Sequence, residues 1–164
     1  MTKLRIGLDI DNCILDWVSA HEKKFKVKIG KVKDSLITKQ VFSCRKDKEF
    51  WSNLELLERP DFVPELYCTK RINSKSYTKL SLQKHNLPIR PIYQLVCQTK
   101  NKASIIRGKC DVLIDDSYFN VMQCINSGFP ALLITRNCNK HIDTPYRINN
   151  LCYKEIEEKY NELF

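Results

Sequence analysis

The sequence is poor in glycine. Its 164 residues contain four, Gly7, Gly30, Gly108 and Gly128, and no two of them lie close together. The GxGxxG loop of dinucleotide-binding proteins and the P-loop of nucleotide triphosphatases both need clustered glycines, because their backbone approaches phosphate closely. The sequence therefore excludes both classes.

The sequence also lacks a membrane-spanning or signal segment and a CxxC pair. No apolar run approaches the roughly 18 residues of a membrane span, and the apolar stretch at residues 4–8 is too short for a signal peptide. The eight cysteines are scattered without a CxxC pair, which argues against a zinc site and a disulfide scaffold. We therefore expect a cytoplasmic protein with reduced thiols and no membrane partner.

Short apolar runs recur along the chain with little internal alternation, as in strands covered on both faces. Amphipathic stretches lie between them, which favours helices on both faces of a parallel sheet. The prediction is an α/β fold with a Rossmann-like three-layer core and a mainly parallel five-stranded sheet. The expected strands lie at residues 4–8, 66–68, 92–96, 112–114 and 131–134.

The stretches between the strands carry helix signals. Ser74 is a candidate N-cap for a helix with Tyr77 and Leu80 on its inner side. Ser117 is a candidate start for a helix that ends near Gly128. Further helices are expected at residues 102–107 and 153–163.

Residues 16–60 break the alternation, because no strand pattern occurs there. We expect this segment to form a small helical insert, and residues 1–15 and 61–164 to form the core. Residues 23–48 hold ten Lys and Arg against two acids, a net charge of +8 in a chain of +9. This basic run indicates either a solvated face or a cap that attracts an anionic substrate.

Two carboxylates follow the first predicted strand. Asp9 and Asp11 are spaced i, i+2, so on a strand they point to the same side. Burying two adjacent carboxylates is costly unless a cation accompanies them, and Mg²⁺ is the hard cation that commonly binds beside phosphates. This pair alone is weak evidence, because the same pattern occurs in turns.

A second acidic pair, Asp115 and Asp116, follows the predicted strand at residues 112–114. In an open α/β sheet, ligands collect beyond the carboxyl ends of the strands. Four carboxylates delivered to that edge predict a Mg²⁺ site, although one acid of the second pair is also a candidate cap for the following helix.

Other strand ends supply groups that bind phosphate. Thr69, Lys70 and Arg71 follow the strand at residues 66–68, and the Thr69 hydroxyl is a candidate donor to a phosphate oxygen. Lys102 is a candidate to neutralise charge on the phosphoryl group and the carboxylates, with Lys100 as the other lysine for this role.

The order of these motifs resembles the haloacid dehalogenase superfamily of phosphatases, in which DxD, Thr/Ser, Lys and an acidic pair follow successive strands. Within it, the chain is most similar to the 5'(3')-deoxyribonucleotidases, whose motifs read DxDGVLADF, ICTS and LIDD. Asn12, Cys13 and Lys70-Arg71 stand where that family has Gly, Val and Ser-Pro. The matching positions here are Asp9-Ile10-Asp11, Thr69, Lys102 and Asp115-Asp116.

The resemblance implies roles for these residues. Asp9 would attack phosphorus to form an aspartyl-phosphate, and Asp11 would act as the general acid and base. Mg²⁺ would be held by Asp9, the main-chain carbonyl of Asp11, and Asp116, with Asp115 bound directly or through water. Thr69, Lys70 and Lys102 would bind the phosphate.

The resemblance also implies that the insert selects the substrate. Phe42 and Trp51 are candidates to stack on a base, and Arg71 is a candidate substrate contact. The expected activity is a Mg²⁺-dependent nucleotidase acting on nucleoside monophosphates. The alternatives are a phosphatase acting on nucleic-acid ends, a dehalogenase in which Asp9 attacks carbon without a metal, and a non-catalytic binding module. The oligomeric state stays open.

Overall fold

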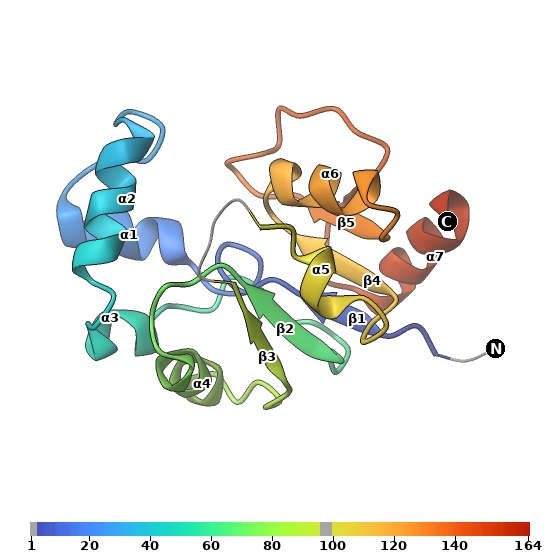
Figure 1. Cartoon of the computed structure of the whole chain (residues 1–164), viewed down its shortest axis with the longest axis horizontal. Coiled ribbons are helices and arrows are strands. Elements are labelled where there is room, and N and C mark those ends of the chain that lie inside the picture. Colours follow the sequence, from blue (N-terminus) through green and yellow to red (C-terminus); the bar gives the residue numbers. More distant parts are fainter. Residues whose placement is uncertain (1–2, 96–99) are drawn as a thin grey trace.

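A computed structural model describes residues 3–95 and 100–164 of the chain (Figure 1). Their strands form one six-stranded sheet in the order β3-β2-β1-β4-β5-β6, and every neighbouring pair is parallel. Along the chain the elements are β1 (Ile6–Leu8), α1 (Trp17–Phe25), α2 (Asp34–Ser43), α3 (Lys48–Ser52), β2 (Leu66–Thr69), α4 (Lys75–Lys84), β3 (Ile92–Gln94), α5 (Ala103–Ile106), β4 (Val112–Asp115), α6 (Tyr118–Asn126), β5 (Ala131–Ile134), β6 (Arg147–Ile148) and α7 (Tyr153–Leu163).

The parallel α/β architecture is confirmed, but the prediction of five strands is wrong. The sixth strand, β6, has two residues and pairs with the outer edge of β5. So short an element carries no apolar run that would mark it in the sequence. The strand expected at residues 92–96 is β3, and Val96 lies outside the described residues.

The sheet is the middle of three layers, because alternate residues of its strands face different apolar clusters. In β4, Val112 and Ile114 pack into one cluster, whereas Leu113 packs into the other. Residues of α4 and α7 join the first cluster, and residues of α5 and α6 join the second. Figure 1 shows these helices around the central sheet.

Gly7 lies at the centre of β1, where neighbouring side chains approach closely. A Cβ atom at this position would lie 2.9 Å from Cys110 Sγ and 3.0 Å from Leu66 Cδ1. A larger residue here would therefore force the Cys110 or Leu66 side chain to move.

Helices α1, α2 and α3 lie between β1 and β2 in the chain and gather at one end of the molecule (Figure 1). They lie within the predicted insert. The two segments that connect it to the sheet run side by side, since Asp16 N donates to Glu55 O at 2.8 Å and Leu57 N donates to Ile14 O at 2.9 Å. Trp51 of α3 belongs to the same apolar cluster as the residues of β1.

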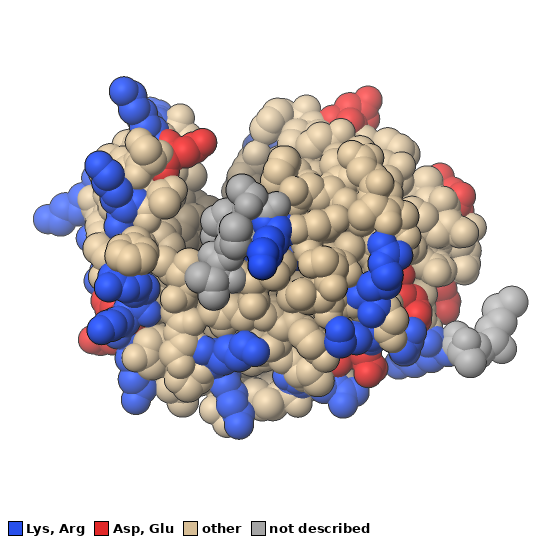
Figure 2. All heavy atoms as spheres, in the orientation of Figure 1, with Lys and Arg blue, Asp and Glu red and all other residues tan. Residues whose placement is uncertain are grey.

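The basic residues of the insert lie largely on its outer surface, where Figure 2 shows lysines and arginines over α1 and α2. Helix α2 contains no buried residue. Two of the lysines pair with acids, Lys24 with Asp47 at 2.7 Å and Lys28 with Glu22 at 2.9 Å. No helix in the described residues is long and apolar enough to cross a membrane.

Helix α4 begins after Ser74, whose hydroxyl accepts a hydrogen bond from Ser76 N, as the N-cap prediction requires. The predicted inner face is partly wrong. Leu80 is exposed, and the residues that the helix buries are Thr78, Ser81 and Leu82.

The seven described cysteines are all free, and five of them are buried. They act as small apolar side chains in the core. Cys97 lies outside the described residues.

Candidate active site

The chain segments that follow β1 and β4 meet at one edge of the sheet. Asp9 comes directly after β1, Asp115 is the last residue of β4, and Asp116 follows it. Carboxylate oxygens of these three residues lie within 4.8 Å of one another. Asp9 N donates to Ile114 O at 2.8 Å, so the parallel pairing of the two strands continues to the acids and brings them together.

Lys102 lies between two of these carboxylates. Its Nζ donates to Asp115 Oδ2 at 2.7 Å and also to Asp9 Oδ1, and its side chain is 1% exposed. Lys102 precedes α5, whereas Lys100 is exposed. Of the two lysines that the sequence offered, Lys102 is the one that reaches the acids.

The site carries more negative than positive charge. Burial raises the pKa of Asp9 well above its ordinary value, and Asp115 and Asp116 add to this while Lys102 opposes it. Burial and the Asp115 charge raise the pKa of Asp116 to about 7. Burial alone would lower the pKa of Lys102, but Asp115 and Asp9 outweigh it and raise that pKa. Burial is therefore the main cause of the raised pKa of Asp9 and of Asp116, because it penalises the charged form, whereas the neighbouring carboxylates cause the raised pKa of Lys102.

The donor set fits a divalent cation. Asp9, Asp115 and Asp116 offer hard carboxylate oxygens close enough to share one ion, and an ion there would offset their repulsion. Neighbouring groups orient these ligands. Asn120 of α6 donates to both oxygens of Asp115 at 3.1 and 3.2 Å, and the Asn12 side chain bonds to Asp116.

The alternative role of Asp115 or Asp116 as the cap of the next helix is wrong. Ser117 is the N-cap of α6, and its hydroxyl accepts a hydrogen bond from Asn120 N. Asp115 accepts one bond from Ser117 N at 2.9 Å, which fixes its carboxylate at the start of the turn.

Thr69 is buried at the end of β2, and its hydroxyl oxygen has no hydrogen-bond partner within the described residues. A buried hydroxyl without a partner is unfavourable, and a phosphate oxygen is a suitable acceptor for it. Lys70 follows, with its Nζ donating to Asn120 Oδ1 at 2.8 Å, and burial lowers the pKa of Lys70.

Asp11 lies beside Arg71. It accepts hydrogen bonds from Arg71 Nε at 2.9 Å and from Arg71 Nη2 at 2.6 Å. The substrate contact by Arg71 stays a prediction, and in the structure its guanidinium is buried against Asp11.

The two aromatic candidates for base stacking lie in different surroundings. Trp51 is 1% exposed, and its indole N–H donates to Cys44 O at 2.9 Å, so it is part of the packed interior. Phe42 is 56% exposed on α2, with the Arg45 guanidinium 3.9 Å from its ring centre. The contact of either ring with a base stays a prediction, and of the two only Phe42 has an exposed ring.

Sequence reasoning missed Arg136, which follows β5. Arg136 donates to Asn12 O at 2.9 Å, to Cys13 O at 2.6 Å and to Glu58 at 2.8 Å. It thus ties both connections of the insert to the core. No local pattern marks this arginine, because its partners are distant in sequence and two of them are main-chain oxygens.

Asn12 adopts a φ of +57°, a left-handed conformation that asparagine tolerates better than most residues.

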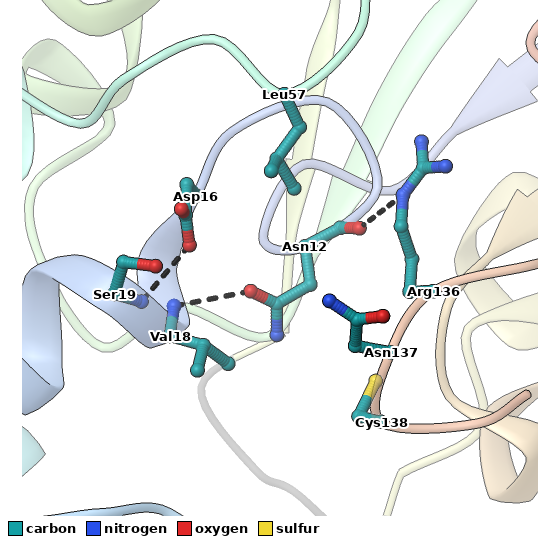
Figure 3. A pocket seen from close by; sticks show the side chains of 8 residues that line it. All are labelled: Asn12, Asp16, Val18, Ser19, Leu57, Arg136, Asn137 and Cys138. Carbon is teal, nitrogen blue, oxygen red and sulfur yellow. Dashed lines mark hydrogen bonds between the residues drawn. The ribbon is translucent and has the colours of Figure 1, made fainter.

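A cavity of about 160 Å³ lies between the start of the insert and the segment that follows β5 (Figure 3). It is next to Asp116, because Cys138 Sγ lies 3.8 Å from Asp116 Oδ2. It is lined by Asn12, Asp16, Val18, Ser19, Leu57, Arg136, Asn137 and Cys138.

The parallel sheet with helices on both faces is a Rossmann-like three-layer α/β fold. A solved L-2-haloacid dehalogenase matches 99% of this chain over 100% of its own length, with a TM-score of 0.60 and 9% sequence identity. At that identity the likeness shows the fold alone. No protein-family model and no curated protein matches the sequence.

Proposed function

We propose that the protein is a Mg²⁺-dependent phosphomonoesterase that acts through an aspartyl-phosphate on Asp9. The observation that carries the proposal is the group of three carboxylates, Asp9, Asp115 and Asp116, gathered around buried Lys102 at the end of the sheet. Metal-assisted phosphoryl transfer uses such a combination of acidic ligands and a fixed cation.

In the proposed reaction, an Asp9 carboxylate oxygen attacks phosphorus while the ester oxygen of the substrate leaves. Asp11 gives the leaving oxygen a proton. Asp11 then takes a proton from a water molecule, whose oxygen attacks phosphorus and releases phosphate, so that the Asp9 carboxylate is restored. The aspartyl-phosphate divides one difficult displacement into two easier ones. Proton transfer by a positioned acid increases the reaction rate by about 10²–10⁴-fold.

Fixed donors would stabilise the charge on the phosphoryl oxygens. The proposed donors to the phosphoryl oxygens are the Thr69 hydroxyl, which has no partner within the described residues, and the Lys102 ammonium. Lys70 would be a further cation. Asp9, Asp116 and the main-chain carbonyl of Asp11 would hold Mg²⁺, with Asp115 beside them. Bound Mg²⁺ supplies positive charge that offsets repulsion between phosphate and carboxylates.

The proposed substrate is a nucleoside monophosphate, on the basis of the motif resemblance. The +8 charge of residues 23–48 supports an anionic substrate. It equally favours a phosphorylated nucleic-acid end, whose binding would weaken steeply with salt. Comparison of mononucleotides with 3'- or 5'-phosphorylated oligonucleotides across a salt series separates the two substrates.

A dehalogenase is the second candidate function, because a solved structure with this fold is an L-2-haloacid dehalogenase. In that chemistry Asp9 would attack carbon and displace halide without a metal. The grouping of Asp116 with Asp9 and Asp115 argues against it, since a metal-free reaction gives three clustered carboxylates no shared task.

The deciding experiment is a panel of phosphomonoesters and 2-haloacids, assayed with Mg²⁺ and with EDTA. We expect phosphate release that needs Mg²⁺ and disappears in Asp9→Asn. Halide release that survives EDTA would establish the dehalogenase instead. A protein that turns over neither class but binds nucleotides would be a binding module. The proposed location is the cytoplasm, which the free cysteines support.

A further inference from the structure

Arg71 is held against Asp11 in a buried ion pair. The Arg71 side chain is 0% exposed and that of Asp11 is 23% exposed. Arg71 Nε lies 2.9 Å from Asp11 Oδ2, and Arg71 Nη2 lies 2.6 Å from Asp11 Oδ1. Two nearly parallel hydrogen bonds fix the plane of the carboxylate as well as its distance.

Three other elements hold Arg71 itself. Its Nη1 donates to Thr78 Oγ1 of α4 at 3.1 Å, and its guanidinium carbon lies 5.2 Å from the ring centre of Trp51 in α3. Its main-chain oxygen accepts a hydrogen bond from Gln94 of β3 at 2.7 Å. Arg71 is therefore fixed by the core and by the insert at once.

This arrangement differs from an exposed ion pair, which contributes little because both side chains move freely. Within the described residues, Asp11 is the only acid that forms an ion pair with Arg71. A buried guanidinium needs such a partner, so the interaction constrains both side chains. Proton transfer requires the acid to lie within hydrogen-bond reach of the reacting oxygen, and small displacements are costly.

We propose that Arg71 is a positioning residue that orients Asp11 toward the oxygen of the leaving group, and that Thr78 and Trp51 set the orientation of Arg71. The inference rests on the proposed phosphatase activity and on the role of Asp11 in it. It links the insert to proton transfer through the contact between Trp51 and Arg71.

The test compares Arg71→Met and Arg71→Lys with wild type on two substrates that differ in leaving group. An alkyl phosphate needs protonation of its leaving oxygen, whereas p-nitrophenyl phosphate does not. We expect Arg71→Met to lower kcat for the alkyl phosphate by about 10²-fold, to affect p-nitrophenyl phosphate far less, and to leave KM nearly unchanged. Arg71→Lys should recover part of the loss, because it keeps the charge without the two-pronged geometry.

A double-mutant cycle with Asp11→Asn tests whether Arg71 acts through Asp11. In the Asp11→Asn background, Arg71→Met should cause no further selective loss. Equal losses on both substrates, or additive losses in the cycle, would overturn the proposal. Arg5→Met is the control, because Arg5 forms an exposed ion pair with Asp111 at 2.7 Å.

Thermal denaturation identifies variants that do not fold at the assay temperature. If Arg71→Met is one of these, Thr78→Val carries the test, because it removes one hydrogen bond of Arg71 and keeps the ion pair. A selective loss on the alkyl phosphate supports the proposal, and a uniform loss or none overturns it. If wild type hydrolyses neither substrate with Mg²⁺, it is the proposed function that fails.

Discussion

Lys102 is the buried cation of the acidic site, and its removal has a calculable effect on stability. Replacement by Met keeps the length of the side chain but leaves Asp9 and Asp115 without the ammonium that they share. Breaking a buried ion pair from one side costs about 3–5 kcal/mol. For a chain of 164 residues, this lowers Tm by about 6–20 °C.

The assay is thermal denaturation of wild type, Lys102→Met and Lys100→Met, each with and without Mg²⁺. Lys100 is the matched control, because it is an exposed lysine two positions away. We expect Lys100→Met to melt close to wild type, and Mg²⁺ to recover part of the loss in Lys102→Met. A Tm for Lys102→Met within about 2 °C of wild type, equivalent to about 1 kcal/mol or less, would refute the reasoning about the buried pair.

Three further predictions concern the same site and the insert. Asp9→Asn should abolish turnover but lower Tm less than Lys102→Met does, because Lys102 keeps Asp115 as a partner and the repulsion among the acids falls; turnover and Tm are measured on one preparation. Mg²⁺ at a hundred times its Kd should raise the wild-type Tm by about 5–10 °C. The Asp116→Asn variant should lose most of this increase in Tm, whereas the control Asp143→Asn, at an exposed position, should keep it. Replacing exposed lysines of residues 23–48 by Gln should raise KM for anionic substrates more than it lowers kcat, whereas Lys154→Gln on α7 should leave both unchanged.

The architecture was largely predictable, because buried parallel strands leave a clear pattern. Short apolar runs marked five of the six strands, and Asp9, Thr69 and Asp115 stand at or just beyond the carboxyl ends of three of them. Parallel pairing then requires these residues to lie at one edge of the sheet. The prediction of a shared acidic edge followed from this constraint and did not depend on details of packing.

The missed elements lack such a pattern. Strand β6 (Arg147–Ile148) exists through its hydrogen bonds with β5, which sequence reading cannot detect. In α4, hydrophobicity favoured Leu80 for the inner face, yet the helix buries Thr78 and Ser81. Thr78 accepts a hydrogen bond from Arg71, and this bond gives its buried hydroxyl a partner that hydrophobicity alone does not predict.

The buried surroundings of Arg71 and Trp51 were unpredictable for the same reason. An arginine after a strand end and an aromatic residue in an insert are typical of substrate contacts. Here the Arg71 guanidinium binds Asp11 and faces the ring of Trp51, so these residues satisfy one another inside the protein. A charged side chain is buried only where a partner of opposite charge lies beside it. The residues next to Arg71 in the sequence do not show that Asp11 is this partner.

The distribution of ion pairs indicates where a metal ion is most needed. Lys102 pairs with Asp9 and Asp115, and Arg71 pairs with Asp11, whereas Asp116 forms no ion pair within the described residues. When all four carboxylates are ionised they exceed the two buried cations by two charges, one on Asp116 and one shared by Asp9 and Asp115, which have only Lys102 in common. A divalent cation bound between Asp116 and Asp9 would offset that excess and would leave both ion pairs intact. Asp116 would then contribute mainly to metal affinity, while Lys102 and Arg71 would maintain the geometry of the two carboxylates that act on the substrate.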